Sequence, residues 1–122
     1  LNMAKSQGKI KKVKRIRRHR RVRAKIYGTA ERPRLCVYKS NRGMHAQIIN
    51  DDKSITLFGV SQQDIKSTKG NKTDLARELG KILGQKAKGQ KIMTVVFDRG
   101  GFKYHGRIKA FAESVREAGI KF

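Results

Sequence analysis

The sequence predicts an α/β protein with one mixed β-sheet, two helices packed on one face of it, and a basic arm before it. Three short segments of strand-like composition follow one another on short turns, which indicates an antiparallel meander. Two longer segments carry apolar residues at three- and four-residue steps, which indicates amphipathic helices. An apolar segment between those helices adds a fourth strand, so the predicted order is βββαβα.

The first element is the arm. Twelve Lys and Arg residues and no acid fall between Lys5 and Lys25, and the first acidic residue is Glu31. A folded core cannot bury so many like charges, because each would lose its hydration with no counter-charge to replace it. We expect the free arm to be largely disordered, and to become helical when a polyanion neutralises it. Nucleic acid is the favoured polyanion, since arginine both stacks on bases and binds two phosphate oxygens at once.

Two other interpretations of the arm are less favoured. A mitochondrial transit peptide would be rich in serine, whereas this segment is rich in Lys and passes directly into the domain. A membrane-surface helix would need apolar anchors, and the arm has only scattered aliphatic residues without Phe or Trp. Residues 31–122 keep 19 Lys and Arg against 9 Asp and Glu in a chain of net charge +22, so the partner is expected to touch the body too.

The strands follow a boundary at residues 28–33 (GTAERP), which separates an arm over residues 1–30 from a domain over residues 31–122. The predicted strands cover residues 35–38, 45–49 and 55–60, with turns at residues 40–43 and 50–54. Residues 61–70 are polar and show no periodicity, so we expect a loop there.

The predicted helix after that loop begins at Asn71 or Thr73, either of which can cap it, and ends near Lys88. Its apolar stripe consists of Leu75, Ala76, Leu79, Ile82, Leu83 and Ala87. Residues 92–97 (IMTVVF) are almost continuously apolar, which predicts a strand buried on both faces. A last helix ends at Gly119 and presents one apolar stripe, made of Ile108, Phe111, Ala112 and Val115.

The loop over residues 98–106 (DRGGFKYHG) is a candidate binding surface, because it follows a strand and precedes a helix, where α/β sheets bind ligands. Its basic side chains and the flat faces of Phe102, Tyr104 and His105 suit unpaired bases. Neither GxGxxG nor GxxxxGK[ST] is present, so it is not a phosphate-cradling nucleotide loop. The alternative is an ordinary turn with exposed polar residues.

The first predicted strand offers another surface. Alternation places Leu35 and Val37 on the core face, and the opposite face carries Arg34, Cys36, Tyr38 and Ser40, extended by His45. A polar and aromatic sheet face is one way in which proteins bind RNA. The alternative is a partly exposed sheet face with no partner.

Metal, cofactor and catalytic chemistry are not expected. One cysteine, Cys36, and three widely spaced histidines give neither a disulfide nor the ligand spacing of a zinc site, and we expect Cys36 to fill space. No segment reaches the roughly 18 apolar residues that a membrane span requires. Asp98 and His105 resemble an acid–base pair, but an aspartate there more often caps a turn or pairs with Arg99. A metal-dependent nuclease needs clustered carboxylates, and the chain has few acids.

Two long blocks of the chain resemble a known family. The blocks are RRHRRVRAKIYGTAERPRLCVYKSNRGMHAQII and VVFDRGGFKYHGRIKAFAESVREAGIKF. They are similar to the bacterial-type large-subunit ribosomal protein eighteen family, which binds 5S rRNA. The resemblance implies a compact, non-enzymatic α/β domain that joins 5S rRNA to the large-subunit rRNA beside neighbouring ribosomal proteins, in a bacterial cytoplasm or a plastid stroma. The alternative is a less specific, chaperone-like RNA- or DNA-binding protein.

The residues and the resemblance together give one predicted set of RNA contacts, in which the arm, the first strand and turn, and the glycine loop all take part. The set consists of Arg15, Arg17, Arg18, His19, Arg20, Arg21, Arg23, Lys25, Arg32, Arg34, Tyr38, Ser40, Asn41, Arg42, His45, Arg99, Lys103, Tyr104, His105, Arg107 and Lys109.

Overall fold

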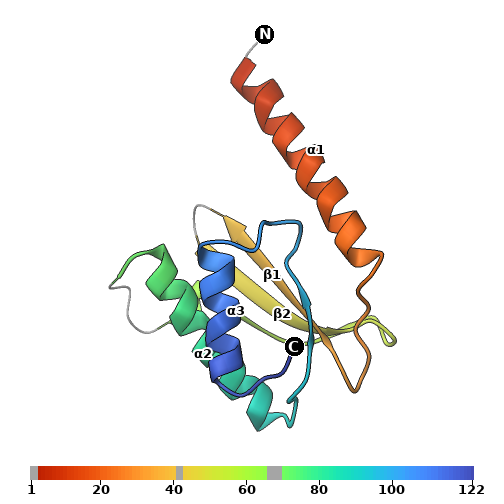
Figure 1. Cartoon of the computed structure of the whole chain (residues 1–122), viewed down its shortest axis with the longest axis vertical. Coiled ribbons are helices and arrows are strands. Elements are labelled where there is room, and N and C mark those ends of the chain that lie inside the picture. Colours follow the sequence, from red (N-terminus) through yellow and green to blue (C-terminus); the bar gives the residue numbers. More distant parts are fainter. Residues whose placement is uncertain (1–2, 41–42, 66–69) are drawn as a thin grey trace.

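Figure 1 shows a computed structural model of the chain, which describes residues 3–40, 43–65 and 70–122, with side chains from Lys9 onward. The elements in chain order are α1 (Met3–Arg23), β1 (Arg34–Ser40), β2 (Gly43–Asn50), β3 (Ile55–Ser61), the 3-10 helix η1 (Gln62–Asp64), α2 (Lys72–Gly89), β4 (Val96–Asp98) and α3 (Arg107–Glu117). After α1, the strands and α-helices follow the predicted succession βββαβα, which is confirmed.

The strands form one mixed sheet in the order β3-β2-β1-β4. β1 pairs antiparallel with β2 and β2 antiparallel with β3, which confirms the predicted meander. β4 lies parallel to β1, which it reaches after the intervening helix α2. α2 and α3 lie side by side and pack against one face of the sheet, as Figure 1 shows. The opposite side of β1 is therefore open to other contacts.

The core lies between the sheet and the two helices. Leu35 and Val37 of β1 point into it, as the alternation predicted, and they meet apolar side chains of α2 and α3 such as Leu79 and Phe111. The stripes of both helices face the same core, because their apolar residues recur at three and four positions. Burial of these stripes is the main favourable term that holds the helices to the sheet.

α2 begins where the sequence allows a cap. The Asn71 side chain accepts a hydrogen bond from the backbone N–H of Asp74 at 2.9 Å, and the Asp74 carboxylate accepts one from the backbone N–H of Asn71. This reciprocal pair satisfies two backbone donors that the first helical turn leaves without partners. The cap is therefore Asn71, the first of the two predicted candidates.

Two glycines of α2 set its distance from α3. A Cβ on Gly80 would lie 2.7 Å from the carbonyl oxygen of Phe111, and one on Gly84 would lie 2.4 Å from the Cβ of Ala118. The hydroxyl of Ser114 uses this closeness to donate a hydrogen bond to the Arg77 carbonyl at 2.6 Å. The two helices thus touch through backbone and small side chains.

The segment over residues 92–97 corrects one prediction. We expected a strand buried on both faces, but only Val96–Asp98 forms β4, and it lies at the edge of the sheet. Met93 keeps 47% of its surface exposed, and Thr94 forms only an isolated bridge with Lys121. The run is apolar because the edge strand packs on the C-terminus, where the rings of Phe97 and Phe122 stack at 5.2 Å.

The predicted loop over residues 61–70 is partly regular. Ser61 ends β3 and Gln62–Asp64 forms η1, which the lack of periodicity did not indicate. Residues 66–69 lie outside the described residues.

The arm is helical and docked on the body. The sequence predicts a segment that is largely disordered on its own and helical once its charge is neutralised; in the structure Met3–Arg23 forms the helix α1, which projects from the body in Figure 1. The segment contains no proline to interrupt a helix, and its C-terminal half is held by side-chain contacts to the body. Those contacts stabilise the helix, whereas the repulsion among its own like charges destabilises it.

We predict that Gly80→Ala destabilises the protein by about 1–3 kcal/mol, because the added methyl group meets backbone that cannot move aside. Urea unfolding measures the change. The matched control is Gly89→Ala in the same helix, where an added Cβ has nothing within 4 Å; it should be neutral or slightly stabilising. Equal loss in both variants would contradict the close approach of α2 and α3.

Candidate nucleic-acid interface

A buried arginine joins two carboxylates beneath the cationic surface. Arg34, at the start of β1, is 8% exposed. Its Nε and Nη2 donate to the two carboxylate oxygens of Asp51 at 3.0 and 3.2 Å, and its Nη1 donates to Asp98 Oδ2 at 2.8 Å. The guanidinium therefore ties β1 to the turn after β2 and to the end of β4.

Asp98 is the most buried charge of this network, with no exposed surface. Its second oxygen accepts the backbone N–H of Gly100 at 2.9 Å. Burial by itself would raise the pKa of this carboxyl, but the hydrogen bonds from Gly100, His19 and Arg34 more than offset it, so the pKa of Asp98 lies below its ordinary value. The pKa of Asp51 is also lowered, because bonds from Arg34 and the backbone N–H of Gly28 outweigh its burial.

The same carboxylates hold α1 against the body. His19 Nε2 lies 3.0 Å from Asp98 Oδ2, and Arg18 donates through Nε to the carbonyl oxygen of Gly101 at 3.0 Å. One turn later, Arg23 Nη1 lies 3.4 Å from Asp51 Oδ2. Arg18, His19 and Arg23 thus fix the last two turns of the helix to the body.

Gly101 makes this docking possible. A Cβ at this position would lie 2.6 Å from the carbonyl oxygen of Arg15, and the residue has φ +79°. Only glycine combines that backbone conformation with so close an approach of the helix. The absence of a side chain at Gly101 therefore allows α1 to pack directly on the loop.

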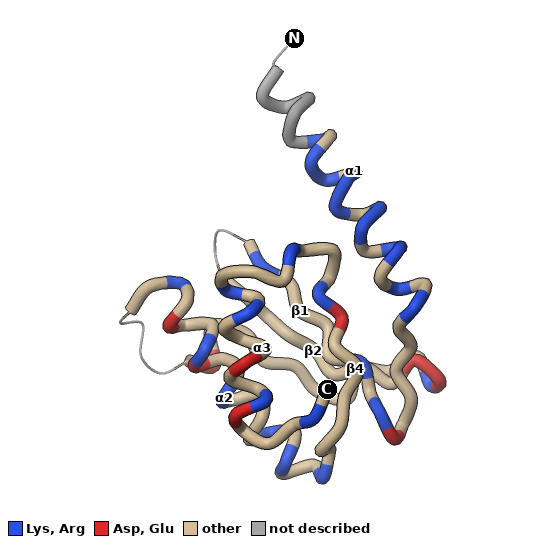
Figure 2. Tube along the Cα trace, in the orientation of Figure 1, with Lys and Arg blue, Asp and Glu red and all other residues tan. Residues whose placement is uncertain are grey.

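Docking divides the arm's cations into two groups. Arg15, Arg18, His19 and Arg23 are half-buried on the face that meets the body. The exposed cations of the arm are Lys9, Lys11, Lys12, Lys14, Arg17, Arg20, Arg21 and Lys25. Figure 2 shows Lys and Arg recurring along α1 toward the body. The sequence does not distinguish the cations that contact the body from those that are exposed. The docked helix does, because several of its cations bind groups of the body.

An aromatic cluster lies where α1 passes β1. The ring of Tyr38 meets His45 on the neighbouring strand at 5.0 Å and the edge of Phe102 from the glycine loop at 5.7 Å. The guanidinium of Arg15 lies 5.4 Å from the Tyr38 ring and 5.3 Å from that of Phe102. Lys39 adds an ammonium 5.6 Å from Phe102, and burial followed by the charge of Arg107 lowers its pKa.

Two hollows flank the contact between α1 and the glycine loop. One, of about 660 Å³, lies at the C-terminal end of α1 and is lined by the arm and by Arg99. The other, of about 550 Å³, lies between α1 and the pair Tyr38 and Phe102, with Lys and Arg of the arm on its other wall. Arg18 borders both. Such concave, cationic surfaces suit a polyanion backbone.

The other predicted residues of the body either form contacts within it or are exposed. Arg107 donates to the Ser40 carbonyl at 3.1 Å and so ties the start of α3 to the end of β1. The exposed members of the set on the body are Arg32, Tyr38, Ser40, His45, Lys103, Tyr104, His105 and Lys109. Asn41 and Arg42 lie outside the described residues.

Arg34 corrects the predicted set. The alternation of β1 placed it on the open face, but its guanidinium is buried between Asp51 and Asp98, which take up its donors. The prediction failed because both acids lie far from Arg34 in the sequence. The predicted contact set also lacks Lys39, Lys11, Lys12 and Lys14, and it lacks Phe102 although the sequence indicated that ring as a stacking surface. The basic character of the arm was the available signal for the lysines.

Metal or cofactor binding finds little support in the described residues. His19, Cys36 and Asp98 place ligand atoms within 4.8 Å of one another. Asp98, however, already accepts three hydrogen bonds, and the adjacent Arg34 cation repels a metal ion. Burial, followed by the charge of Asp98, raises the pKa of the Cys36 thiol to about 11, which disfavours the thiolate that a metal binds.

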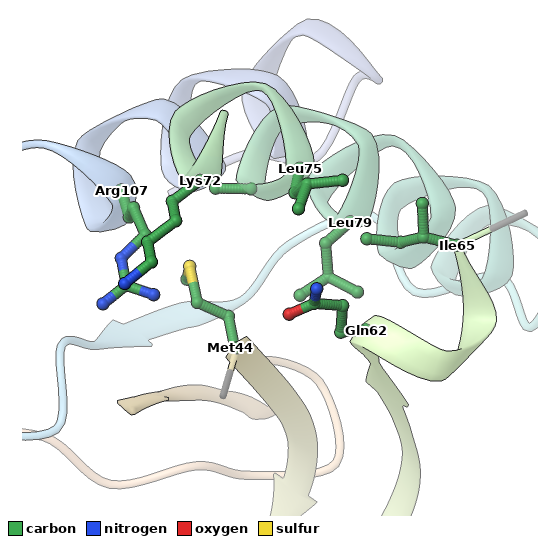
Figure 3. Close-up of a pocket in the computed structure, with 9 residues that line it drawn as sticks. Met44, Gln62, Ile65, Lys72, Leu75, Leu79 and Arg107 are labelled. Atoms are coloured by element: carbon green, nitrogen blue, oxygen red, sulfur yellow. The ribbon is translucent and has the colours of Figure 1, made fainter. Parts of the chain in front are cut away.

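A separate cavity lies between β2 and α2 (Figure 3). Met44, Leu75, Leu79 and Ile65 line it, with Lys72 and Arg107 at its edge. Its volume of about 60 Å³ is far below the roughly 300–1,000 Å³ of small-molecule sites. In the part of the chain that the structure describes, no helix combines the length and apolar character needed to cross a membrane.

This arrangement defines a class of small, strongly basic α/β proteins in which a helical arm and the body share one cationic surface. Comparison with known proteins identifies the family within that class. The family model of ribosomal protein L18 of archaea, bacteria, mitochondria and chloroplasts matches residues 9–122, so the chain belongs to this family. The resemblance noted in the two sequence blocks is thereby confirmed.

Individual relatives agree. The chain is 52% identical over 112 residues to the large ribosomal subunit protein uL18 of Pediococcus pentosaceus, which covers 92% of this chain and 95% of the relative. It is 52% identical over 108 residues to the protein of that name from Lactiplantibacillus plantarum, covering 88% and 92% of the two chains. The Streptococcus suis protein is 53% identical over 108 residues, covering 88% and 89%.

We predict that Gly101→Ala loosens α1 from the body, because the methyl group would overlap the Arg15 carbonyl. Limited trypsin digestion should then cut the arm faster than in the wild type, since a docked helix resists cleavage. Gly106→Ala is the matched control: its φ is also positive at +56°, but an added Cβ meets nothing within 4 Å. Equal acceleration in both variants would show that backbone strain, rather than helix contact, is responsible.

We predict that the protein loses stability in acid through Asp98 and Asp51. Both have a folded-state pKa below the ordinary value of about 3.9, so they stabilise the fold fully above about pH 5. That contribution disappears as the pH falls below about 4 and through the folded-state pKa. Urea unfolding at about pH 7 and about pH 3 should show the loss. Asp98→Asn should cost about 3 kcal/mol near neutral pH and flatten the pH dependence; an unchanged dependence would contradict the network.

Proposed function

We propose that the protein is a structural constituent of the large ribosomal subunit that binds 5S rRNA and helps attach it to the large-subunit rRNA at the central protuberance. The relatives are named as large ribosomal subunit proteins, which supports the ribosomal assignment. The observation that carries the proposal is the docked arm, because its contacts to Gly101 and Asp98 hold the cations of α1 beside the glycine loop. The ribosome of a bacterial cytoplasm or of a plastid is then the place of action.

The arm and the body contribute different terms to binding. Each exposed Lys or Arg that neutralises a phosphate releases a condensed counterion, so the arm supplies affinity that falls steeply with salt. Phosphate contacts carry no sequence information by themselves. Selectivity for one RNA therefore depends on the body, where Tyr38, His45 and the loop of residues 99–107 form a surface of fixed shape.

The proposed contact set keeps the exposed predicted residues and omits Arg34. Arg18, His19 and Arg23 act mainly by positioning α1, because each has a partner in the body. Lys11, Lys12 and Lys14 join the set, since they line the hollow beside Tyr38. Asn41 and Arg42 stay predicted contacts from the family resemblance alone. Neighbouring ribosomal proteins are proposed as further partners, and no catalytic step is assigned.

The test compares binding of purified protein to 5S rRNA and to tRNA as salt increases. We expect 5S rRNA to bind more tightly at every salt concentration, and equal affinities would refute the proposal. A chain lacking residues 1–14 keeps the docked turns of α1 but loses much of the projecting charge. It should show a shallower salt dependence, by roughly 0.7–0.9 per lost phosphate contact, with selectivity for 5S rRNA retained.

The same variant separates the alternative, a less specific chaperone-like binder of RNA or DNA that acts through the arm. That protein would bind every RNA more weakly once residues 1–14 are removed and would show no preference among RNAs before or after the removal. A triple variant, Arg17→Gln with Arg20→Gln and Arg21→Gln, provides the control at full chain length, because these residues are exposed on α1.

A further inference from the structure

The hollow between α1 and β1 differs from the rest of the cationic surface, because aromatic rings form one of its walls. Lys11, Lys12, Lys14, Arg15 and Arg18 border it on the arm, and Tyr38 and Phe102 border it on the body. It is open to solvent and has a volume of about 550 Å³. A groove that only follows a phosphate backbone has no need of the rings.

The two rings form one corner of the hollow, and we call the space in front of them the slot. They meet edge to face, with an interplanar angle of 76° and centroids 5.7 Å apart. Tyr38 is 39% exposed, so part of its ring is accessible to a ligand. A planar group that enters the hollow can stack on one ring and touch the edge of the other.

A planar group already lies in front of both rings. The guanidinium of Arg15 is 5.4 Å from one centroid and 5.3 Å from the other, so it is centred on neither. Elsewhere in the molecule, Arg116 lies only 4.4 Å from the ring of Phe122. A guanidinium in this position can itself stack on a further planar group.

The walls of the slot are fixed before any ligand arrives. The arm wall is held by Arg18 and His19, and the loop wall by the positive-φ glycines Gly100 and Gly101, which bring Phe102 beside β1. Preorganised walls lower the ordering cost of binding. The hollow is therefore a built feature of the docked arm.

We propose that this hollow takes one unpaired base of the bound RNA, stacked on Phe102 with the edge of Tyr38 and the guanidinium of Arg15 beside it, and with the adjoining phosphates on the arm lysines. A cationic side chain is excluded by the surrounding charge, and a bare phosphate gains nothing from the rings. A base within a duplex has both faces covered by its neighbours, so the ligand is a base in a bulge or loop. The inference rests on the proposed function and deepens it.

The first experiment uses the absence of tryptophan from the chain. Phe102→Trp places a single fluorescent ring in the hollow, and the probes are an RNA hairpin with a short single-stranded bulge and the same hairpin fully paired. We expect the bulged hairpin to quench the tryptophan and the paired hairpin to leave it largely unchanged. Met93→Trp, exposed and outside the hollow, is the control and should respond equally to both. Equal quenching of the Phe102→Trp variant by both hairpins would overturn the proposal.

The second experiment measures affinity with the full chain. Phe102→Leu keeps an apolar side chain and the net charge but removes the ring, so it should weaken binding of the bulged hairpin roughly tenfold and leave the paired hairpin and the salt dependence unchanged. Phe58→Leu, in β3 away from the hollow, is the matched control and should change neither. Equal weakening of both RNAs would show that Phe102 only positions α1. No weakening of either RNA would show that no base binds in the hollow. Either result overturns the proposal.

The two proposals fail in different ways. If the wild type does not prefer 5S rRNA to tRNA but Phe102→Leu still weakens only the bulged hairpin, the ribosomal assignment fails and the base slot stands. If 5S selectivity is present and Phe102→Leu does not distinguish the two hairpins, the base slot alone is refuted.

Discussion

The pairing of Arg34 with Asp51 and Asp98 is the interaction on which the rest of the molecule depends. One guanidinium joins β1, the turn after β2 and the end of β4, and the two carboxylates that neutralise it also receive His19 and Arg23 of α1. Within the described residues, no buried side-chain nitrogen or oxygen lacks a partner. That completeness matters, because a buried charge left unpaired costs several kcal/mol. In a chain of net charge +22, two acids thus account for the attachment of the most basic segment.

Attachment changes what the positive charge can do. A flexible basic segment binds any polyanion and orders itself at an entropic cost. A docked helix instead keeps its exposed cations in fixed positions and leaves hollows of defined shape on either side of the contact. Gly101 shows how closely the body is adapted to this helix, since even a methyl group there would displace it. Charge attracts a polyanion, and docking gives the joined surface a fixed shape.

Local patterns predicted much of the fold. The meander, the Asn71 cap and the stripes of α2 and α3 depend on neighbours within a few residues, so their residue patterns are sufficient. Predictions failed where a distant partner decides the outcome. Residues 92–97 have the composition of a central strand but lie at an edge, because the C-terminus covers them. Arg34 has the position of a surface residue on an alternating strand but is buried, because acids 17 and 64 residues away converge on it.

The sequence by itself determined the class of fold, the polyanion character of the partner and the family, since these follow from composition, short-range periodicity and long matching blocks. Only the tertiary structure decided which cations face outward and which hold the molecule together. It also decided that Arg15, Tyr38 and Phe102 meet around one hollow. The physical reason is that charge and propensity are properties of single residues and their neighbours. Pairing across 64 to 83 positions arises only when the sheet is formed and the arm is docked on it.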